Sequence, residues 1–169
     1  MSRILRKISK SKWYDPSIYS WLEQGEFQAD SLDDLRTHDN ELSIWIIEDE
    51  SALLRIITAM ATNCDKVDKF DCAILEIEFL NKLNTKLVIH EGETPDKAAN
   101  TSWHYNIVEL SANKVLQIAE LILKHAQKKR IQKKDVKRFI IDGVSQGYLD
   151  RSKLSQKIIE EIEAPPQSK

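Results

Sequence analysis

Histidine and acidic side chains gather in one stretch of the sequence, where they could act as metal ligands or as a general acid and base. The group contains His90, Glu91, Glu93 and Asp96, and His104 follows. Imidazole and carboxylate groups can together hold a transition metal, so a metal-dependent hydrolase using His90, Glu93 and His104 is one hypothesis. The stretch lacks the HExxH spacing that places two histidines on one helix face. An acidic turn that caps the following helix explains the same residues without a metal.

Other candidates for catalysis are weak. His38 precedes Asp39, but the histidine–carboxylate pair of a catalytic triad is defined in space rather than by adjacency. Cys64 is expected just beyond a helix C-terminus, which does not favour a thiolate. Cys72 lies among apolar residues typical of a core. The four glycines form neither a GxGxxG nor a GxxxxGK[ST] pattern. The sequence therefore assigns no catalytic residue and no cofactor.

Charged residues are sorted into blocks, although the net charge is only −2. Residues 1–12 contain five basic side chains and no acid, and residues 13–65 contain twelve acids against two arginines. Residues 124–138 contain eight basic side chains against one acid. Opposite blocks of this kind permit head-to-tail or two-fold self-association. They favour an interaction surface over a pocket.

The two basic blocks could contact a nucleic-acid backbone without sequence preference. A helical hairpin, expected over residues 135–146 and 151–162, does not favour groove recognition, because its second helix ends in an acidic run that repels phosphate. In the simpler interpretation, the lysines complement helix C-termini and keep the surface hydrated. The residues assigned to nucleic-acid contact in this alternative are Arg3, Arg6, Lys7, Lys128, Lys129, Arg130, Lys133, Lys134, Lys137 and Arg138.

Aromatic residues are concentrated in the first acidic stretch. Tryptophan and tyrosine suit interfaces, because they offer a large contact area with few rotatable bonds. The same rings could instead fill the edge of a core, and the sequence does not decide between the two roles. The residues assigned to partner binding on this basis are Trp13, Tyr14, Tyr19, Trp21 and Phe27.

Composition indicates one globular domain. The chain has 169 residues, of which 41% are hydrophobic and 31% charged, and this length can bury one core. No apolar run approaches the roughly 18 residues of a membrane span, so no membrane association is expected. The two cysteines lie eight residues apart and form no disulfide framework. Together with the absence of an apolar segment behind the basic N-terminus, they favour a cytoplasmic location.

The predicted fold class is α+β, with a small central sheet of two to four strands and a predominantly helical C-terminal half. Residues 42–47 form the best strand, and Asp49 can cap a helix with period 3.6 behind it. Residues 86–90 predict another strand. Residues 70–83 fit either a strand or a helix, and a short strand at 71–75 leading into a short helix is preferred.

The remaining C-terminal residues predict helices. These are expected over residues 95–110, after Ser111, over residues 135–146 and after Asp150, each with a capping signal and an apolar stripe. The expected organisation is therefore a basic N-terminal arm (1–12), one globular domain (13–163) and a frayed tail (164–169).

Sorted charge without a catalytic signature favours a non-enzymatic, cytoplasmic interaction protein of the adaptor, regulatory or immunity kind. Its partner would be a protein, or a second copy of the chain. Non-specific nucleic-acid binding is the first alternative, and the metal-dependent hydrolase is the second.

Overall fold

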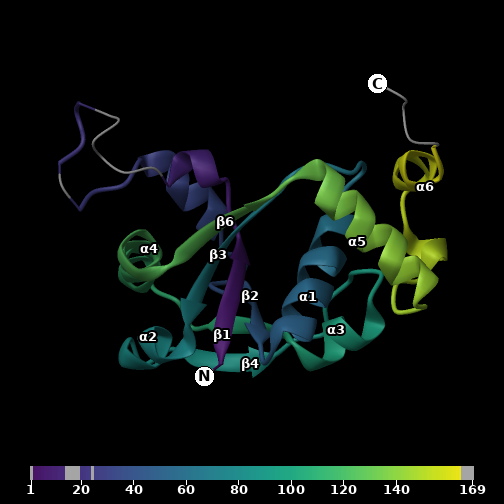
Figure 1. Cartoon of the computed structure of the whole chain (residues 1–169). Coiled ribbons are helices and arrows are strands. Elements are labelled where there is room, and N and C mark those ends of the chain that lie inside the picture. The colour runs from purple at the N-terminus through teal and green to yellow at the C-terminus, as the bar shows by residue number, and fades with distance from the viewer. Residues whose placement is uncertain (1, 14–19, 24, 165–169) are drawn as a thin grey trace.

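An antiparallel sheet of six strands forms the centre of the computed structural model, which describes residues 2–13, 20–23 and 25–164 (Figure 1). The strand order is β4-β5-β2-β1-β3-β6, so β4 and β6 are the two edges. The strands are β1 (Arg3–Lys7), β2 (Leu42–Ile47), β3 (Phe70–Glu76), β4 (Lys86–Ile89), β5 (His104–Val108) and β6 (Gln127–Ile131).

Helices cover both faces of the sheet (Figure 1). One face, called the α1 face below, packs against four helices: α1 (Glu50–Thr62), α3 (Lys97–Ser102), α5 (Lys133–Ser145) and α6 (Gln156–Glu163). The opposite face, called the α4 face below, packs against α2 (Ile77–Lys82), α4 (Ala112–His125) and the 3-10 helix η3 (Ala29–Leu35). Short 3-10 turns, η1 (Lys10–Lys12) and η4 (Arg151–Lys153), complete the described elements. None of the described helices is both long and apolar enough to cross a membrane.

The strand predicted over residues 42–47 is confirmed as β2, and it is buried on both faces. Leu42 and Ile44 point into the core beside α4, whereas Trp45 and Ile47 point into the core beside α1. This burial explains its nearly continuous apolar sequence. Asp49 caps α1 as predicted, because its carboxylate accepts a hydrogen bond from the Ala52 N–H at 2.7 Å. Residues 70–83 also fold as preferred, as β3 followed by α2.

The prediction of a sheet with two to four strands was wrong, because the sheet has six. Three of its strands had been assigned to other structures: β1 to the basic arm, β5 to a helix over residues 95–110, and β6 to a connection between helices. β1 lies between β2 and β3, and it buries Ile4 and Leu5 on opposite faces. The charged residues of β1 and β6 hide the alternation that marks a strand. The expected tail falls mainly on residues 165–169, outside the described residues.

Asp71 joins β3 to β6 and to the turn after β1. Arg130 donates two hydrogen bonds of 2.7 Å to its carboxylate, and the Lys10 N–H donates a third at 3.1 Å. The Arg130 guanidinium holds the pKa of Asp71 below its usual value. Because the folded pKa lies below the unfolded one, the carboxylate stabilises the fold above about pH 4. That contribution is lost as the pH falls through the folded pKa.

Replacing Asp71 by asparagine is expected to lower the free energy of unfolding at pH 7 by about 1–3 kcal/mol. The variant removes the charge that Arg130 holds, but it retains the shape of the side chain. Urea unfolding at pH 7 and at acid pH checks this, because the wild type should lose more stability on acidification than the variant. Equal losses in the two proteins would contradict the role given to Asp71.

Candidate interaction edge and a polar row on the sheet

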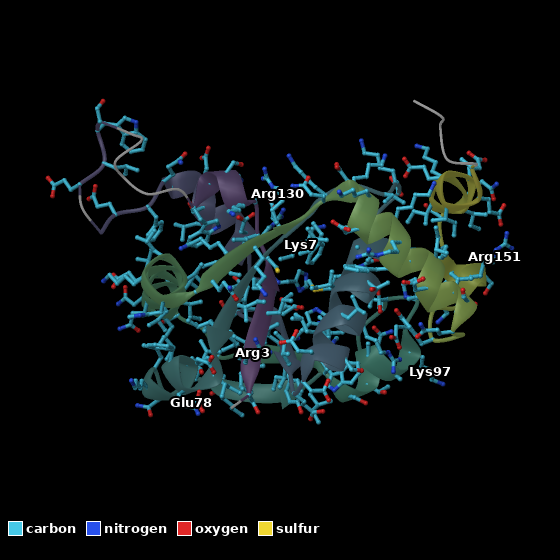
Figure 2. The ribbon with its side chains drawn as sticks, viewed as in Figure 1. Arg3, Lys7, Glu78, Lys97, Arg130 and Arg151 are labelled. Carbon is cyan, nitrogen blue, oxygen red and sulfur yellow. The ribbon has the colours of Figure 1, made fainter. Side chains whose placement is uncertain are left out.

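The basic residues expected to contact nucleic acid come from β1, β6 and α5; Figure 2 labels three of them, Arg3, Lys7 and Arg130. Arg6 is partly buried, and its guanidinium donates to the backbone oxygens of Asp34 (2.9 Å) and Ser43 (2.7 Å). Burial lowers the pKa of Arg6. Ion pairs join Arg3 to Glu50, Arg130 to Asp71, Lys133 to Glu161 and Arg138 to Asp135.

Two further lysines of this set donate to backbone carbonyls: Lys128 to Leu123 and Lys137 to Ala164. Within the described residues, only Lys7, Lys129 and Lys134 make neither an ion pair nor a bond to a carbonyl. Lys133 and Lys134 lie at the N-terminus of α5 rather than at a helix C-terminus. The surface therefore offers phosphate fewer free cations than the sequence suggests.

The aromatic set divides between the core and the surface. Trp13 is only 2% exposed, it stacks on Phe27 at 5.9 Å between ring centroids, and its indole N–H donates to Asp34 at 2.8 Å. Trp21 is 67% exposed. Tyr14 and Tyr19 lie outside the described residues. Of the residues assigned to partner binding, Trp13 therefore has a structural role.

The three residues proposed as metal ligands, His90, Glu93 and His104, line one hollow of about 310 Å³. His104 Nε2 lies 2.7 Å from the Ser43 hydroxyl, and its Nδ1 lies 2.8 Å from the His90 carbonyl oxygen. A carbonyl can only accept, so Nδ1 carries the proton and Nε2 accepts from Ser43. Both ring nitrogens are thus engaged. In the described part of the chain, no group of three or more His, Cys, Asp or Glu residues could hold a metal ion.

A polar row crosses the α1 face of the sheet where α1 ends. The pairing registers place Val88 opposite Asn106, Asn106 opposite Ser43, Lys7 opposite Cys72, and Cys72 opposite Lys129. Lys7 and Ser43 lie beyond the last β1–β2 pair, Leu5–Trp45, and both line the same hollow. Cys64, just beyond α1, accepts a hydrogen bond from the Lys7 ammonium at 3.4 Å. The only signal of this row in the sequence is Ser43, a single hydroxyl within the apolar run of β2.

Two polar side chains here are buried: Asn106 in the row and His104 beside it. Asn106 donates its amide to Glu41 at 2.7 Å, while its buried Oδ1 has no hydrogen-bond partner among the described residues. His104 is 8% exposed, and burial lowers its pKa below the usual value. Its imidazole is therefore neutral at pH 7.

The two edges of the sheet have opposite character. β6 carries Lys128, Lys129 and Arg130, and basic side chains on an edge strand prevent pairing with another chain. β4 carries Val88 and Ile89, which are 42% and 61% exposed. Among the described residues, β4 pairs with β5 alone. β4 is four residues long and begins with Lys86, and the rest of its outer edge is apolar.

The backbone of β4 has hydrogen-bonding groups available on its outer edge. The His90 N–H donates to the His104 carbonyl at 3.2 Å, so His90 directs its backbone toward β5. Hydrogen-bonded and non-hydrogen-bonded positions alternate along an antiparallel strand. Val88 therefore also faces β5, and the N–H and C=O groups of Leu87 and Ile89 point outward.

Comparisons with known proteins place the chain in no family: no family model, curated protein or solved structure matches it. At the level of class, the chain is an α+β protein with one apolar sheet edge and a polar row beside it.

Proposed function

We propose that the chain is a cytoplasmic interaction protein of the adaptor, regulatory or immunity kind, and that it associates through β4 with a second copy of itself. The observation that carries the proposal is the contrast between the exposed apolar edge of β4 and the basic edge of β6. Strand addition at such an edge supplies main-chain hydrogen bonds, and the alternate side chains supply specificity. Nucleic-acid binding is the weaker alternative, because seven of its ten basic residues are engaged within the chain.

A second copy is the occupant that best fits β4. Two-fold antiparallel pairing continues the same face of the sheet, so a residue can meet only partners on its own face. One register places Val88 opposite Val88 of the second copy and Leu87 opposite Ile89. Outward backbone groups then meet outward backbone groups, and apolar side chains meet apolar ones. Registers shifted by two residues would place Glu91 opposite Leu87, or Lys86 opposite Val88.

The same edge explains why association would stop at two copies. An isologous two-fold contact uses β4 of both chains and leaves no free apolar edge. The outer strands of the resulting sheet would be the two copies of β6, whose basic side chains repel further pairing. The interface is short and apolar, so we expect a weak dimer that persists at high salt. An acid-to-base contact would dissociate there.

Charge placed at Val88 should control the dimer. Val88→Lys sets two ammonium groups directly opposite each other, and Val88→Glu does the same with two carboxylates. Each variant alone should weaken dimerisation at least about tenfold, because like charges in directly opposed positions repel. An equimolar mixture of the two should recover the dimer through opposed Lys–Glu pairs. Size-exclusion chromatography with light scattering, at low and high salt, measures the mass.

Leu116→Lys is the matched control, since Leu116 is 43% exposed and belongs to α4 rather than to β4. It should retain the mass of the wild type. A wild type that remains monomeric up to concentrations of about 1 mM, the weakest affinity of interest, would overturn the proposal. Charge variants that dimerise as the wild type does would overturn it equally.

A further inference from the structure

We propose that Ser43 and His104 form a nucleophile and general-base pair that hydrolyses small acyl esters, an activity that goes beyond association through β4. The Ser43 hydroxyl lies 2.7 Å from His104 Nε2. This is the distance at which a base can take the hydroxyl proton as the oxygen attacks. The hydroxyl and the imidazole come from neighbouring strands, β2 and β5. Rigid elements therefore hold their geometry.

A third group fixes the orientation of the imidazole. The carbonyl oxygen of His90 lies 2.8 Å from His104 Nδ1, and it selects the tautomer whose Nε2 is free to accept from Ser43. A buried carboxylate has this role in the familiar triad. The carbonyl supplies the orientation but less stabilisation of the imidazolium. We therefore expect slow turnover, confined to esters with good leaving groups.

The surroundings keep His104 in the state that a base requires. Its ring packs against Trp45 with 4.8 Å between centroids. Burial lowers the pKa of His104; the hydrogen bond to the His90 carbonyl opposes this shift, and the His90 and Arg6 charges add smaller lowering contributions. The imidazole is thus unprotonated at neutral pH and can accept the proton of Ser43.

The hollow beside this pair supplies a place for the substrate. Ser43, His104, Trp45, Met60 and Lys7 line the same space of about 310 Å³, which is near the lower limit of small-molecule sites. Trp45 and Met60 offer apolar surface to a short acyl chain. Lys7 also lines the hollow, but its ammonium donates to Cys64, so it would have to leave that contact to reach the oxyanion that develops on the carbonyl.

The reaction balances with an ester and water as the only reactants. Ser43 Oγ forms a bond to the ester carbonyl carbon while its proton passes to His104 Nε2. The tetrahedral intermediate then collapses, the ester C–O bond breaks, and the leaving oxygen takes that proton. Water attacks the acyl-serine, gives its proton to Nε2, and releases the acid. The proton returns to Ser43 Oγ, which restores the pair.

A fluorophosphonate probe tests the proposal on the full chain, because it phosphonylates only activated serines. Intact-mass spectrometry of the wild type should show one adduct, and peptide mapping should place it on Ser43. The adduct should be absent from Ser43→Ala. It should form at least about a hundredfold more slowly in His104→Gln, because general-base assistance is lost. Ser145→Ala is the matched control, since the hydroxyl of Ser145 donates to the Ile141 carbonyl at an exposed position on α5, and it should label as the wild type does.

The pH dependence gives a readout that does not require a variant to fold. The labelling rate of the wild type should rise with pH to a plateau, with its midpoint below the ordinary histidine pKa of about 6.5, because burial lowers the His104 pKa. Circular dichroism establishes whether the Ser43 and His104 variants are folded. A folded wild type that is not labelled at Ser43, or whose rate shows no midpoint below about pH 6.5, would overturn the proposal. Neither result would alter the dimer expected at β4.

Discussion

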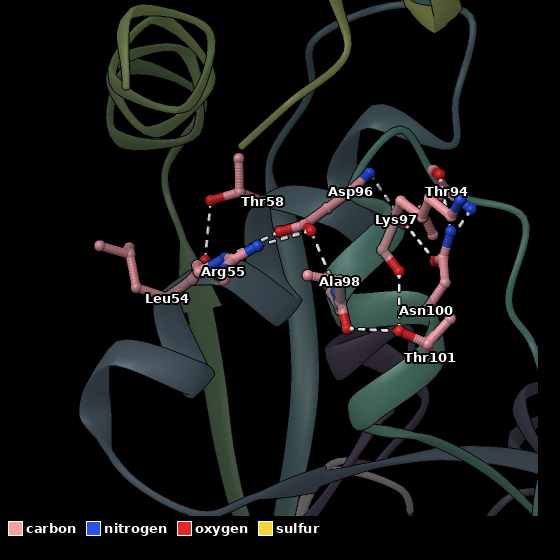
Figure 3. A network of polar contacts seen from close by, with 10 residues as sticks. Leu54, Arg55, Thr58, Thr94, Asp96, Lys97, Ala98, Asn100 and Thr101 are labelled. Carbon is pink, nitrogen blue, oxygen red and sulfur yellow. Dashed lines mark hydrogen bonds and ion pairs between the residues drawn. The ribbon is translucent and has the colours of Figure 1, made fainter. Parts of the chain in front are cut away.

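Replacing Arg55 by alanine should destabilise the protein by about 3–5 kcal/mol, the usual cost of removing one partner from a buried ion pair. The Arg55 guanidinium donates from Nε and Nη2 to the two oxygens of Asp96, at 2.9 and 2.6 Å (Figure 3). Asp96 is fully buried, so its carboxylate would lose its counter-charge without gaining water. Arg55 also lies over the rings of Trp103 (5.3 Å) and Tyr148 (4.8 Å), and alanine removes those contacts too.

The pair holds more than two side chains together. Asp96 caps α3 by accepting the Ala99 N–H at 3.0 Å. Just before this cap, the Thr94 hydroxyl donates to the side-chain oxygen of Asn100 at 2.6 Å (Figure 3). The Asn100 side-chain amide donates back to the Thr94 carbonyl at 2.8 Å. Arg55 thereby attaches α1 to the turn that begins α3. Asp96, named among the possible metal ligands in the sequence, is therefore a structural carboxylate.

Urea unfolding monitored by circular dichroism gives the free energy for each variant. Arg55→Lys retains the charge but can make only one of the two parallel bonds, so its loss should be smaller than that of alanine. Lys86 and Glu109 form an exposed pair, and Lys86→Ala is the matched control, with an expected loss much smaller than that of Arg55→Ala because solvent screens the pair. If Arg55→Ala cost no more than this surface pair, the burial argument would fail.

The elements that the sequence predicts correctly are those whose local pattern and final environment agree. β2 is apolar because both of its faces are buried, and α1 has a carboxylate cap and a clear apolar stripe. β1 and β6 contain charged residues whose partners lie elsewhere in the fold. Arg6 donates to the backbone carbonyls of Asp34 and Ser43, and Arg130 pairs with Asp71 on β3. Such partners are distant in sequence, so no local pattern reveals them.

β5 was missed for another reason. Its apolar residues continue the helical stripe of the preceding segment, and only pairing with β2 and β4 selects the extended form. The pairing of Ser43 with His104 could not be predicted from a local pattern either. His104 was recognised as chemically interesting, but its partner Ser43 lies 61 residues earlier in the chain. The apolar residues of β4 were predicted as a strand, whereas their position at an edge depends on the order of the whole sheet.

The two proposed features meet at one residue. β4 ends at Ile89, and the next carbonyl, that of His90, orients His104. A strand added to β4 would therefore hold the segment that fixes the imidazole. If both proposals are right, the dimer should label faster than the Val88→Lys monomer, because pairing restrains the backbone at His90.

Replacing Trp13 by alanine should cost about 3–5 kcal/mol of stability, as for other buried tryptophans. The ring is 2% exposed and stacks on Phe27. The truncation also removes the indole donor from Asp34, whose carboxylate orders the turn after β1 through the N–H (2.7 Å) and hydroxyl (3.0 Å) of Ser9. Trp13→Phe retains most of the volume but not the donor, so it should lose about 0.5–1.5 kcal/mol, the usual value of one hydrogen bond.

Trp21→Ala is the matched control, because the two residues belong to the same aromatic stretch and Trp21 is 67% exposed. Its stability should stay within about 0.5 kcal/mol of the wild type. Urea unfolding separates the two roles, and light scattering adds a second test. If the aromatic stretch were the interface between copies, Trp21→Ala would reduce the mass of the dimer. If β4 is the interface, Trp21→Ala stays dimeric, and Trp13→Ala acts only through the population of folded chains.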